Sequence, residues 1–130
     1  MRWRGARYGL RARAICQALS DREVTDWVGT VERLWSNNEG RGVLSVRVSD
    51  ILSVETMNNA FSDIDYNTLI PVGSKVQQEA MALHQGERVT FSGNFVPDKD
   101  DCIKENSLTV SGDMTEPAFL FRFSAIRPAE

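Results

Sequence analysis

The segment that decides the fold spans residues 87–96 and reads ERVTFSGNFV. In an extended chain, Val89 and Phe91 point to one side, and Thr90 and Ser92 point to the other. An apolar–polar alternation of period two is typical of a β-strand that packs one face on a core. The segment therefore predicts a strand with its phenylalanines inside.

The same alternation recurs along the rest of the chain. It predicts strands over residues 24–36, 43–49, 51–57 and 118–126, with a weaker strand or loop over 103–110. The segment 37–42, NNEGRG, has the Asn and Gly residues typical of a hairpin loop. Residues 58–65 are polar and turn-like, and 66–70 extend again up to Pro71.

One helix interrupts the predicted strands. Ser74 with Gln77 three residues later matches a capping box, which marks a helix start. Ala80 and His84 continue at helical spacing, and Gly86 is the expected C-cap. A cation at His84 suits the C-terminal end of a helix dipole, so structure accounts for this histidine without catalysis.

In the predicted strands that contain aromatic residues, the rings fall on the same alternating face as the valines, so we expect them to fill the interior. The set consists of Trp27, Trp35, Phe91, Phe95, Phe119, Phe121 and Phe123. Trp35 lies near a strand end, where an exposed position is the alternative. With these rings inside, the outer faces offer hydrogen-bonding groups but no platform on which bases stack.

Three strands, one helix and two strands follow in that order. The arrangement predicts a mainly β protein, a five-stranded Greek-key barrel of the OB type with the helix between strands three and four. Closure of a barrel removes exposed strand edges. A β-sandwich is the alternative, although it needs about seven strands and has less use for the helix. We assign residues 23–128 to the barrel domain and residues 1–22 to a basic N-terminal arm.

Charge divides the chain into two parts. Residues 1–13 hold five arginines and no acid, whereas residues 14–130 hold ten basic and eighteen acidic side chains. An acidic body repels phosphate chains, which argues against nucleic-acid binding by the barrel. The composition, 42% hydrophobic and 25% charged, is ordinary for a globular domain and excludes a collagen or a disulfide-dense miniprotein. No apolar run has the length of a membrane span, so no transmembrane segment is predicted.

An amphipathic helix is expected over residues 6–19. Tyr8, Ala12, Ile15 and Leu19 fall on one face of it, among arginines. We expect this helix to pack on the barrel; a membrane-surface or nucleic-acid arm and an artefactual start are the alternatives. No apolar stretch follows the basic start, so a signal peptide is not indicated.

Five short segments between residues 24 and 127 share a family pattern: Trp27–Val31, Gly42–Leu44, Asn67–Ile70, Gly86–Gly93 and Phe121–Ser124. Together they resemble a bacterial OB-fold family, the tRNA-anticodon-binding-like group, whose members are often described as nucleic-acid-binding lipoproteins. The resemblance implies an OB barrel and nucleic-acid binding. Its motifs determine the fold, so they predict the architecture better than the function. The chain departs from the lipoprotein pattern, because Arg13 stands just before the sequence Ala14-Ile15-Cys16.

Candidate ligand contacts lie on the outer face of the predicted barrel. They are Arg47, Arg122, Thr90, Asn94 and Arg41, with the 37–42 and 97–102 loops as the rim. These positions correspond to the usual OB binding face. A solvated sheet face is the alternative interpretation.

No enzymatic site is predicted. The chain has a single histidine, and it lacks a glycine-rich phosphate loop and a serine nucleophile elbow. Asp98, Asp100 and Asp101 lie close together but lack the other ligands of a calcium loop, so they indicate a solvated turn. Asp63 and Asp65 are likewise expected in turns. We therefore predict no catalytic residue, no metal and no cofactor.

The chain has two cysteines, Cys16 and Cys102. In an oxidising compartment they would join the N-terminal helix to the loop before Ile103, which the chain-entropy model values at about 4–5 kcal/mol. In the cytosol both would stay thiols.

Two functions from different classes follow. The first is a non-enzymatic OB module that binds single-stranded nucleic acid, which the resemblance alone implies. The second is a cell-envelope OB module that binds a protein, peptide or glycan without nucleic-acid affinity, which the acidic body and the buried rings favour. A periplasmic or envelope location is expected if a signal sequence precedes residue 1, and a cytoplasmic one otherwise.

Overall fold

The computed structural model describes residue 16 and residues 22–49, 52–98, 102–106 and 118–129. The predicted helix over 6–19 lies outside these residues apart from Cys16, as do residues 107–110 of the predicted weaker strand. Within the described residues, every helix is too short or too polar to span a lipid bilayer.

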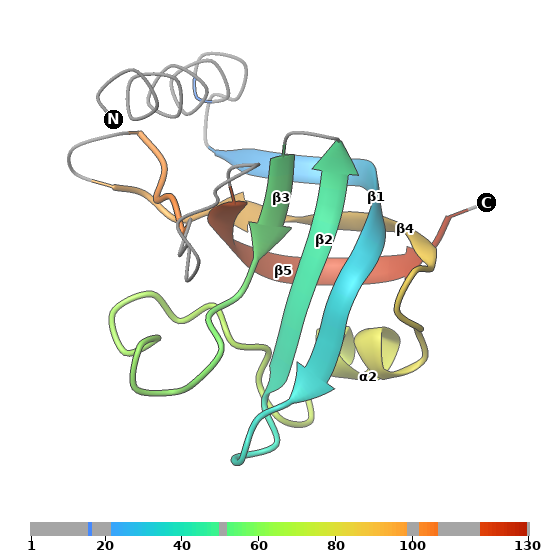
Figure 1. Ribbon diagram of the computed structural model, residues 1–130, viewed down its shortest axis with the longest axis horizontal. Coiled ribbons are helices and arrows are strands. Elements are labelled where there is room, and N and C mark those ends of the chain that lie inside the picture. Colours follow the sequence, from blue (N-terminus) through green and yellow to red (C-terminus); the bar gives the residue numbers. More distant parts are fainter. Residues whose placement is uncertain (1–15, 17–21, 50–51, 99–101, 107–117, 130) are drawn as a thin grey trace, which may run out of the picture.

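The strands close into one barrel (Figure 1). In chain order its elements are β1 (Glu23–Ser36), β2 (Gly42–Ser49), β3 (Leu52–Glu55), α2 (Lys75–Met81), β4 (Arg88–Phe95) and β5 (Ala118–Pro128). Around the barrel the order is β1-β2-β3-β5-β4, and β4 pairs back onto β1. Among these strands β3 and β5 run parallel, and the other neighbours are antiparallel. The prediction of a mainly β, five-stranded barrel with a helix between the third and fourth strands is confirmed.

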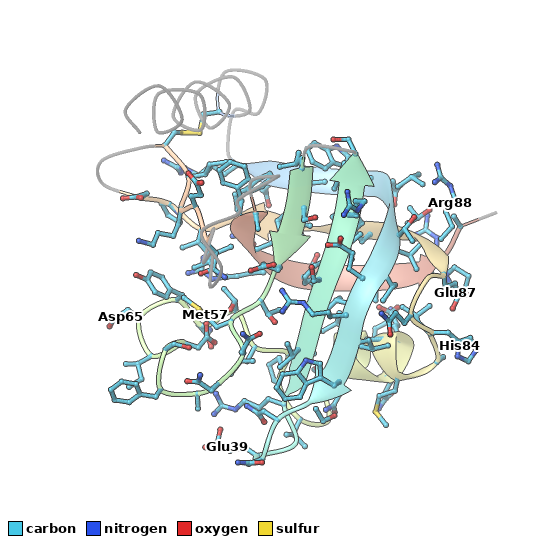
Figure 2. All side chains as sticks on the ribbon, in the orientation of Figure 1. Glu39, Met57, Asp65, His84, Glu87 and Arg88 are labelled. Atoms are coloured by element: carbon cyan, nitrogen blue, oxygen red, sulfur yellow. A yellow bond between two sulfur atoms is a disulfide. The ribbon has the colours of Figure 1, made fainter. Side chains whose placement is uncertain are left out.

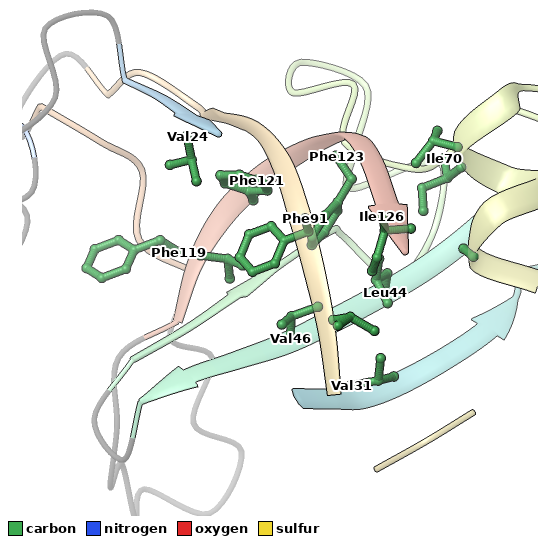
Figure 3. Close-up of a cluster of buried hydrophobic side chains, with 14 of the residues drawn as sticks. Val24, Val31, Leu44, Val46, Ile70, Phe91, Phe119, Phe121, Phe123 and Ile126 are labelled. Carbon is green, nitrogen blue, oxygen red and sulfur yellow. The ribbon is translucent and has the colours of Figure 1, made fainter. Parts of the chain in front are cut away.

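The alternating apolar side chains fill the interior (Figure 3). Phe91 and Phe95 of β4 and Phe121 of β5 are fully buried. The centre of the Phe121 ring lies 5.5 Å from the centre of the Phe91 ring and 5.1 Å from that of Phe95. Both pairs pack edge to face. This arrangement places the positive ring edge on the negative ring face, which adds to the gain from burial. Trp27 packs on two of these rings, and the predicted interior position of the phenylalanines is confirmed.

Helix α2 begins where the sequence predicts. The Ser74 hydroxyl oxygen accepts the N–H of Gln77 at 3.1 Å, and Gln77 Oε1 accepts the N–H of Gly73 at 2.6 Å. The first bond satisfies an amide group that the first turn leaves without a helical partner, and the second ties the residue before the N-cap to the helix. The helix then packs Val76 and Ala80 on the core.

The helix ends earlier than predicted. It stops at Met81 with Ala82 as C-cap, so the prediction of Gly86 as C-cap is wrong. His84 lies beyond the helix and not on it, in a turn where the His84 carbonyl accepts the N–H of Glu87 at 3.1 Å. The N–H of His84 in turn donates to Glu87 Oε1 at 2.9 Å. This local turn competes with the continued helix and accounts for the correction.

A β-bulge in β1 changes which side chains face the core. The pairing with β2 shifts between Val31 and Arg33, so Glu32 is an extra residue in β1. Val31 points inward before the shift, and Leu34 packs on the core after it. Trp35 consequently points outward and is 46% exposed. The prediction that Trp35 shares the interior with Val31 is wrong because the extra residue inverts the alternation.

Two segments predicted as extended form isolated bridges. Ile70 pairs with Gly42, whereas in the other segment Ile103 pairs with Pro97 and Glu105 pairs with Phe119. The first bridge ties the end of the β3–α2 connection to the start of β2, and therefore holds that connection against the β1–β2 turn.

Candidate ligand-binding site

The five predicted contact residues are spread over the barrel. Arg47 lies on β2 beside Ser53 of β3, whereas Arg122 lies on β5 beside Asn94 of β4. Because Ser53 pairs with Ala118, Arg122 lies further along β5 by about 13 Å at 3.3 Å per residue. Arg122 and Asn94 are therefore neighbours, but Arg47 is remote from both.

The other two predicted residues lie elsewhere. Thr90 pairs with Val28 of β1 and Arg127 of β5. Arg41 lies in the β1–β2 turn, with its Nε 3.5 Å from Glu39 Oε1. Both side chains of that ion pair are about half exposed, so the pair contributes little to stability.

Glu32 organises the outer face of β1, β2 and β3. Its Oε1 accepts hydrogen bonds from the hydroxyls of Ser45 at 3.1 Å and Ser53 at 2.9 Å. Its Oε2 accepts from Arg47, with Nη2 at 3.0 Å and Nε at 3.1 Å. The bulge supplies this carboxylate, and the carboxylate neutralises the arginine that the sequence marks as a nucleic-acid contact.

A second carboxylate, Glu55, repeats the arrangement on β3. Its Oε1 lies 3.0 Å from Arg33 Nη2, and its Oε2 accepts from Asn106 Nδ2 at 2.7 Å. The side chain is 11% exposed. Burial raises the pKa of Glu55 from its ordinary value of 4.5, and the Arg33 guanidinium and the two hydrogen bonds oppose that rise in pKa.

Arg122 supports the chain between β3 and α2. Its Nε donates to the carbonyl oxygen of Tyr66 at 2.9 Å, and Lys104 Nζ lies 5.7 Å from the centre of the Tyr66 ring. Asn94 Nδ2 donates to the Phe95 carbonyl at 3.3 Å. Both predicted contact residues thus make hydrogen bonds that hold the fold.

The outward-facing Trp35 lines a groove at the β1–β2 turn. The groove has a volume of about 330 Å³ and runs between that turn and the start of the β3–α2 connection. Besides Trp35, the groove is lined by four asparagines, a glutamate and an alanine. These residues are Asn37, Asn38, Asn58, Asn59, Glu39 and Ala60. Figure 2 shows Glu39 at the tip of the turn and Met57 at the start of the connection.

Two of the four asparagines hold the walls of the groove. Asn37 Oδ1 accepts the N–H groups of Glu39 at 2.9 Å and Arg41 at 3.0 Å. Asn59 Oδ1 accepts the N–H of Ser62 at 2.9 Å. Such bonds from an asparagine to the backbone of its own turn fix the turn conformation. The walls are therefore ordered before any ligand arrives.

The other two asparagines face solvent. Among the described residues, the side chains of Asn38 and Asn58 make no hydrogen bond to the chain, and both are exposed. An amide carries two donors and an acceptor, so these two side chains offer a ligand both kinds of hydrogen bond.

A buried aspartate fixes the rest of the connection. Asp63 is 4% exposed and accepts the N–H groups of Thr68 at 2.7 Å and Leu69 at 2.8 Å, as well as the Thr68 hydroxyl. This anchoring presents Phe61 and Ile64 to solvent, at 86% and 72% exposure. Asp63 thus has the role of a turn residue, in agreement with its predicted place in a turn.

Two further hollows adjoin the groove. One of about 200 Å³ lies on the α2 side of Trp35, between Leu34, Ile70 and Met81. The other, of about 530 Å³, lies beyond Glu39 and is bounded by Arg41. Trp35 therefore separates an amide-lined hollow from a more apolar one.

Cys16 and Cys102 form a disulfide with their Cα atoms 6.1 Å apart. Arg22 Nε donates to the Cys102 carbonyl at 3.1 Å, which adds a second link at the same point. Of the predicted acidic turn, Asp98 is described and residues 100–101 lie outside the described residues. In the described part of the chain, no three His, Cys, Asp or Glu side chains gather in a way that would hold a metal ion.

Sequence reasoning missed the groove for one reason and had one signal that pointed to it. The bulge at Glu32 is invisible in a strict period-two pattern, so the pattern assigned Trp35 to the core. The signal was the repeated Asn-Asn pair at 37–38 and 58–59, which the fold brings to one place.

Comparison of the chain with protein-family models, with curated proteins and with solved structures finds no match.

Proposed function

We propose that this chain is a non-enzymatic binding module built on an OB-type Greek-key barrel, and that its ligand is a protein, peptide or glycan rather than nucleic acid. The strand order β1-β2-β3-β5-β4, the parallel β3–β5 pair and the helix between β3 and β4 support the OB assignment. The family resemblance of the sequence points to the same fold.

The paired charges of the outer face carry the proposal. Nucleic-acid binders of this kind need a basic groove with aromatic rings on which bases stack. Here Arg47 is paired with Glu32 and Arg33 with Glu55. Each guanidinium meets a carboxylate within the protein, so a phosphate would have to displace an existing partner.

The position of the rings supports the same choice. The phenylalanines of β4 and β5 are buried, and Trp35 lies in a groove that, within the described part of the chain, has Glu39 as its one charged lining residue. The Glu39 carboxylate in this groove, offset in part by Arg41 at 3.5 Å, offers a phosphate no attraction. The acidic balance of residues 14–130 acts in the same direction at longer range.

The disulfide supports a location for this module. A bond between Cys16 and Cys102 persists in oxidising compartments and is rare in the cytosol. We therefore place the protein in the cell envelope or outside the cell, where protein and glycan ligands are available.

Oligonucleotide titration tests the proposal against the function that the resemblance implies. Labelled poly(dT) and poly(U) are titrated at low and high salt by fluorescence anisotropy, with Arg47→Ala, Arg122→Ala and, as a control away from both, Arg127→Ala. We expect no saturable binding at low salt. Binding that weakens steeply with salt, and more gently with salt in Arg47→Ala or Arg122→Ala than in Arg127→Ala, would overturn the proposal.

A further inference from the structure

We infer that the groove between the β1–β2 turn and residues 58–60 binds a neutral saccharide chain, with Trp35 as the platform for a sugar ring. The inference rests on the proposed function and names the ligand class within it. It follows from the lining of the groove, its charge and the closure of the barrel.

The lining combines one aromatic face with free amides. A pyranose ring has a face of C–H groups, which packs on the negative face of an aromatic ring, and an edge of hydroxyls. Each hydroxyl both donates and accepts hydrogen bonds. The exposed Trp35 ring matches the face of a sugar, and the unengaged amides of Asn38 and Asn58 match its edge.

The charge of the groove argues for a neutral ligand. Glu39 is the charged residue that lines it, and Arg41 lies 3.5 Å from that carboxylate on the side of the neighbouring hollow. Among the residues that the structure describes, no lysine or arginine lines the groove itself. A phosphate or carboxylate on the ligand would therefore meet repulsion, whereas a neutral polyol would not.

The closed barrel argues against a peptide in this groove. Extended peptides are most often captured by adding a strand to an exposed sheet edge. Each of the five described strands pairs with a neighbour on both sides, so the barrel offers no such edge. A helical peptide needs an apolar groove, whereas amides form most of this wall.

The groove is also ordered before the ligand binds. Asn37 and Asn59 fix its two walls by hydrogen bonds to backbone, and Gln77 Nε2 of α2 donates to the carbonyl of Gly40 at 2.7 Å. A preformed site avoids the entropic cost of ordering loops on binding. Weak individual contacts can then add up to measurable affinity for a chain of several sugar units.

The test is isothermal titration calorimetry of the full chain with cellotetraose, tetra-N-acetylchitotetraose, maltotetraose and mannotetraose. We expect at least one of them to bind with a Kd of about 1 mM or better. Affinity should fall at least about tenfold in Trp35→Ala and less in Trp35→Phe, and it should not change in Val28→Ala, an exposed apolar position outside the groove on the same strand. Raising the salt concentration should leave the affinity unchanged, because the ligand is neutral.

A second pair of variants tests the amides. The double variant Asn38→Ala, Asn58→Ala should weaken saccharide binding at least about tenfold, while Gln85→Ala, which removes an exposed amide outside the groove, should not. Circular dichroism and urea unfolding of each variant confirm that the fold is unchanged, which is expected for exposed side chains without partners in the chain.

Failure of this inference and failure of the proposed function are distinguishable. If none of the four saccharides binds, or if binding is indifferent to Trp35→Ala, the inference is overturned, and the proposed function still stands as long as the oligonucleotide titration shows no saturable binding. If poly(dT) binds and Trp35→Ala abolishes that binding, both are overturned.

Discussion

The carboxylate of Glu55 and the guanidinium of Arg33 form an ion pair of 3.0 Å in which the acid is buried and the base is half exposed. Burial raises the pKa of Glu55 and is the largest influence on it. The attraction of the Arg33 guanidinium lowers this pKa by less than burial raises it. A folded state that holds a proton more tightly than the unfolded chain loses stability as that proton leaves.

Stability should therefore fall with rising pH at this site. Below a pH of about 4.5 Glu55 is protonated in both states, and its contribution is fully present. As the pH rises through the raised pKa, the free energy of unfolding of the wild type should decrease relative to that of Glu55→Gln, which has no proton to lose. Urea unfolding of both proteins from acidic to neutral pH measures the difference. A difference that is constant, or that grows in favour of the wild type, would show that the Arg33 pair dominates.

Glu32→Ala should destabilise the barrel by about 1–3 kcal/mol. The substitution removes the acceptor of the hydroxyls of Ser45 and Ser53, two residues that are 2% and 3% exposed, and it removes the Glu32 carboxylate from Arg47. The control is Glu39→Ala in the exposed β1–β2 turn, which should cost less than about 1 kcal/mol. Equal shifts in the urea midpoint for the two variants would contradict the role assigned to Glu32.

Gly93→Ala should cost about 1–3 kcal/mol or more, because backbone and side-chain atoms of β5 occupy the place that a methyl group on Gly93 would take. A Cβ on Gly93 would lie against the carbonyl oxygen of Arg122 and 2.6 Å from the Phe121 ring. Gly73→Ala is the comparison, because its φ of +79° disfavours alanine but its Cβ would meet no atom within 4 Å. That variant should lose about 1 kcal/mol. Thermal unfolding ranks the two, and a smaller loss in Gly93→Ala would show that the strands separate at low cost.

The disulfide should contribute several kcal/mol to the free energy of unfolding. Cys16 and Cys102 are separated by 86 residues, and in the chain-entropy model closing a loop of that length is worth on the order of 4–5 kcal/mol. Unreduced protein should show no titratable thiol. Cys16→Ser and the double variant with Cys102→Ser should unfold at similarly lower urea concentrations. Two reactive thiols in native protein would contradict the bond and, with it, the proposed location.

The sequence predicts the elements well and their faces less well. The alternation at Val89, Phe91 and Phe95 identifies β4 and its buried face, because a regular strand keeps one period throughout. The same reasoning fails in β1, where the extra residue at Glu32 depends on pairing with β2 and leaves no local mark. Which face Trp35 occupies is therefore a property of two strands together.

For the candidate site, too, the sequence predicts some features and leaves others open. The sequence marks Arg47 and Arg122 as outer-face residues, but it does not show their partners, Glu32 and the Tyr66 carbonyl, which are distant in sequence. Pattern reasoning identifies an exposed arginine without showing what neutralises it. The groove needs the β1–β2 turn and the β3–α2 connection side by side, and this proximity follows from the Ile70–Gly42 bridge.

The parallel pairing of β3 with β5 has a consequence for how the molecule is made. β3 is complete by residue 55, yet its second neighbour begins at Ala118. While the nascent chain emerges from the ribosome, one side of β3 has no strand to pair with until residues 118–128 have been translated. Long-range pairing of this kind is slow and leaves intermediates that are prone to aggregate. The yield of folded protein should therefore rise with chaperones that cover that side of β3 until β5 has been translated.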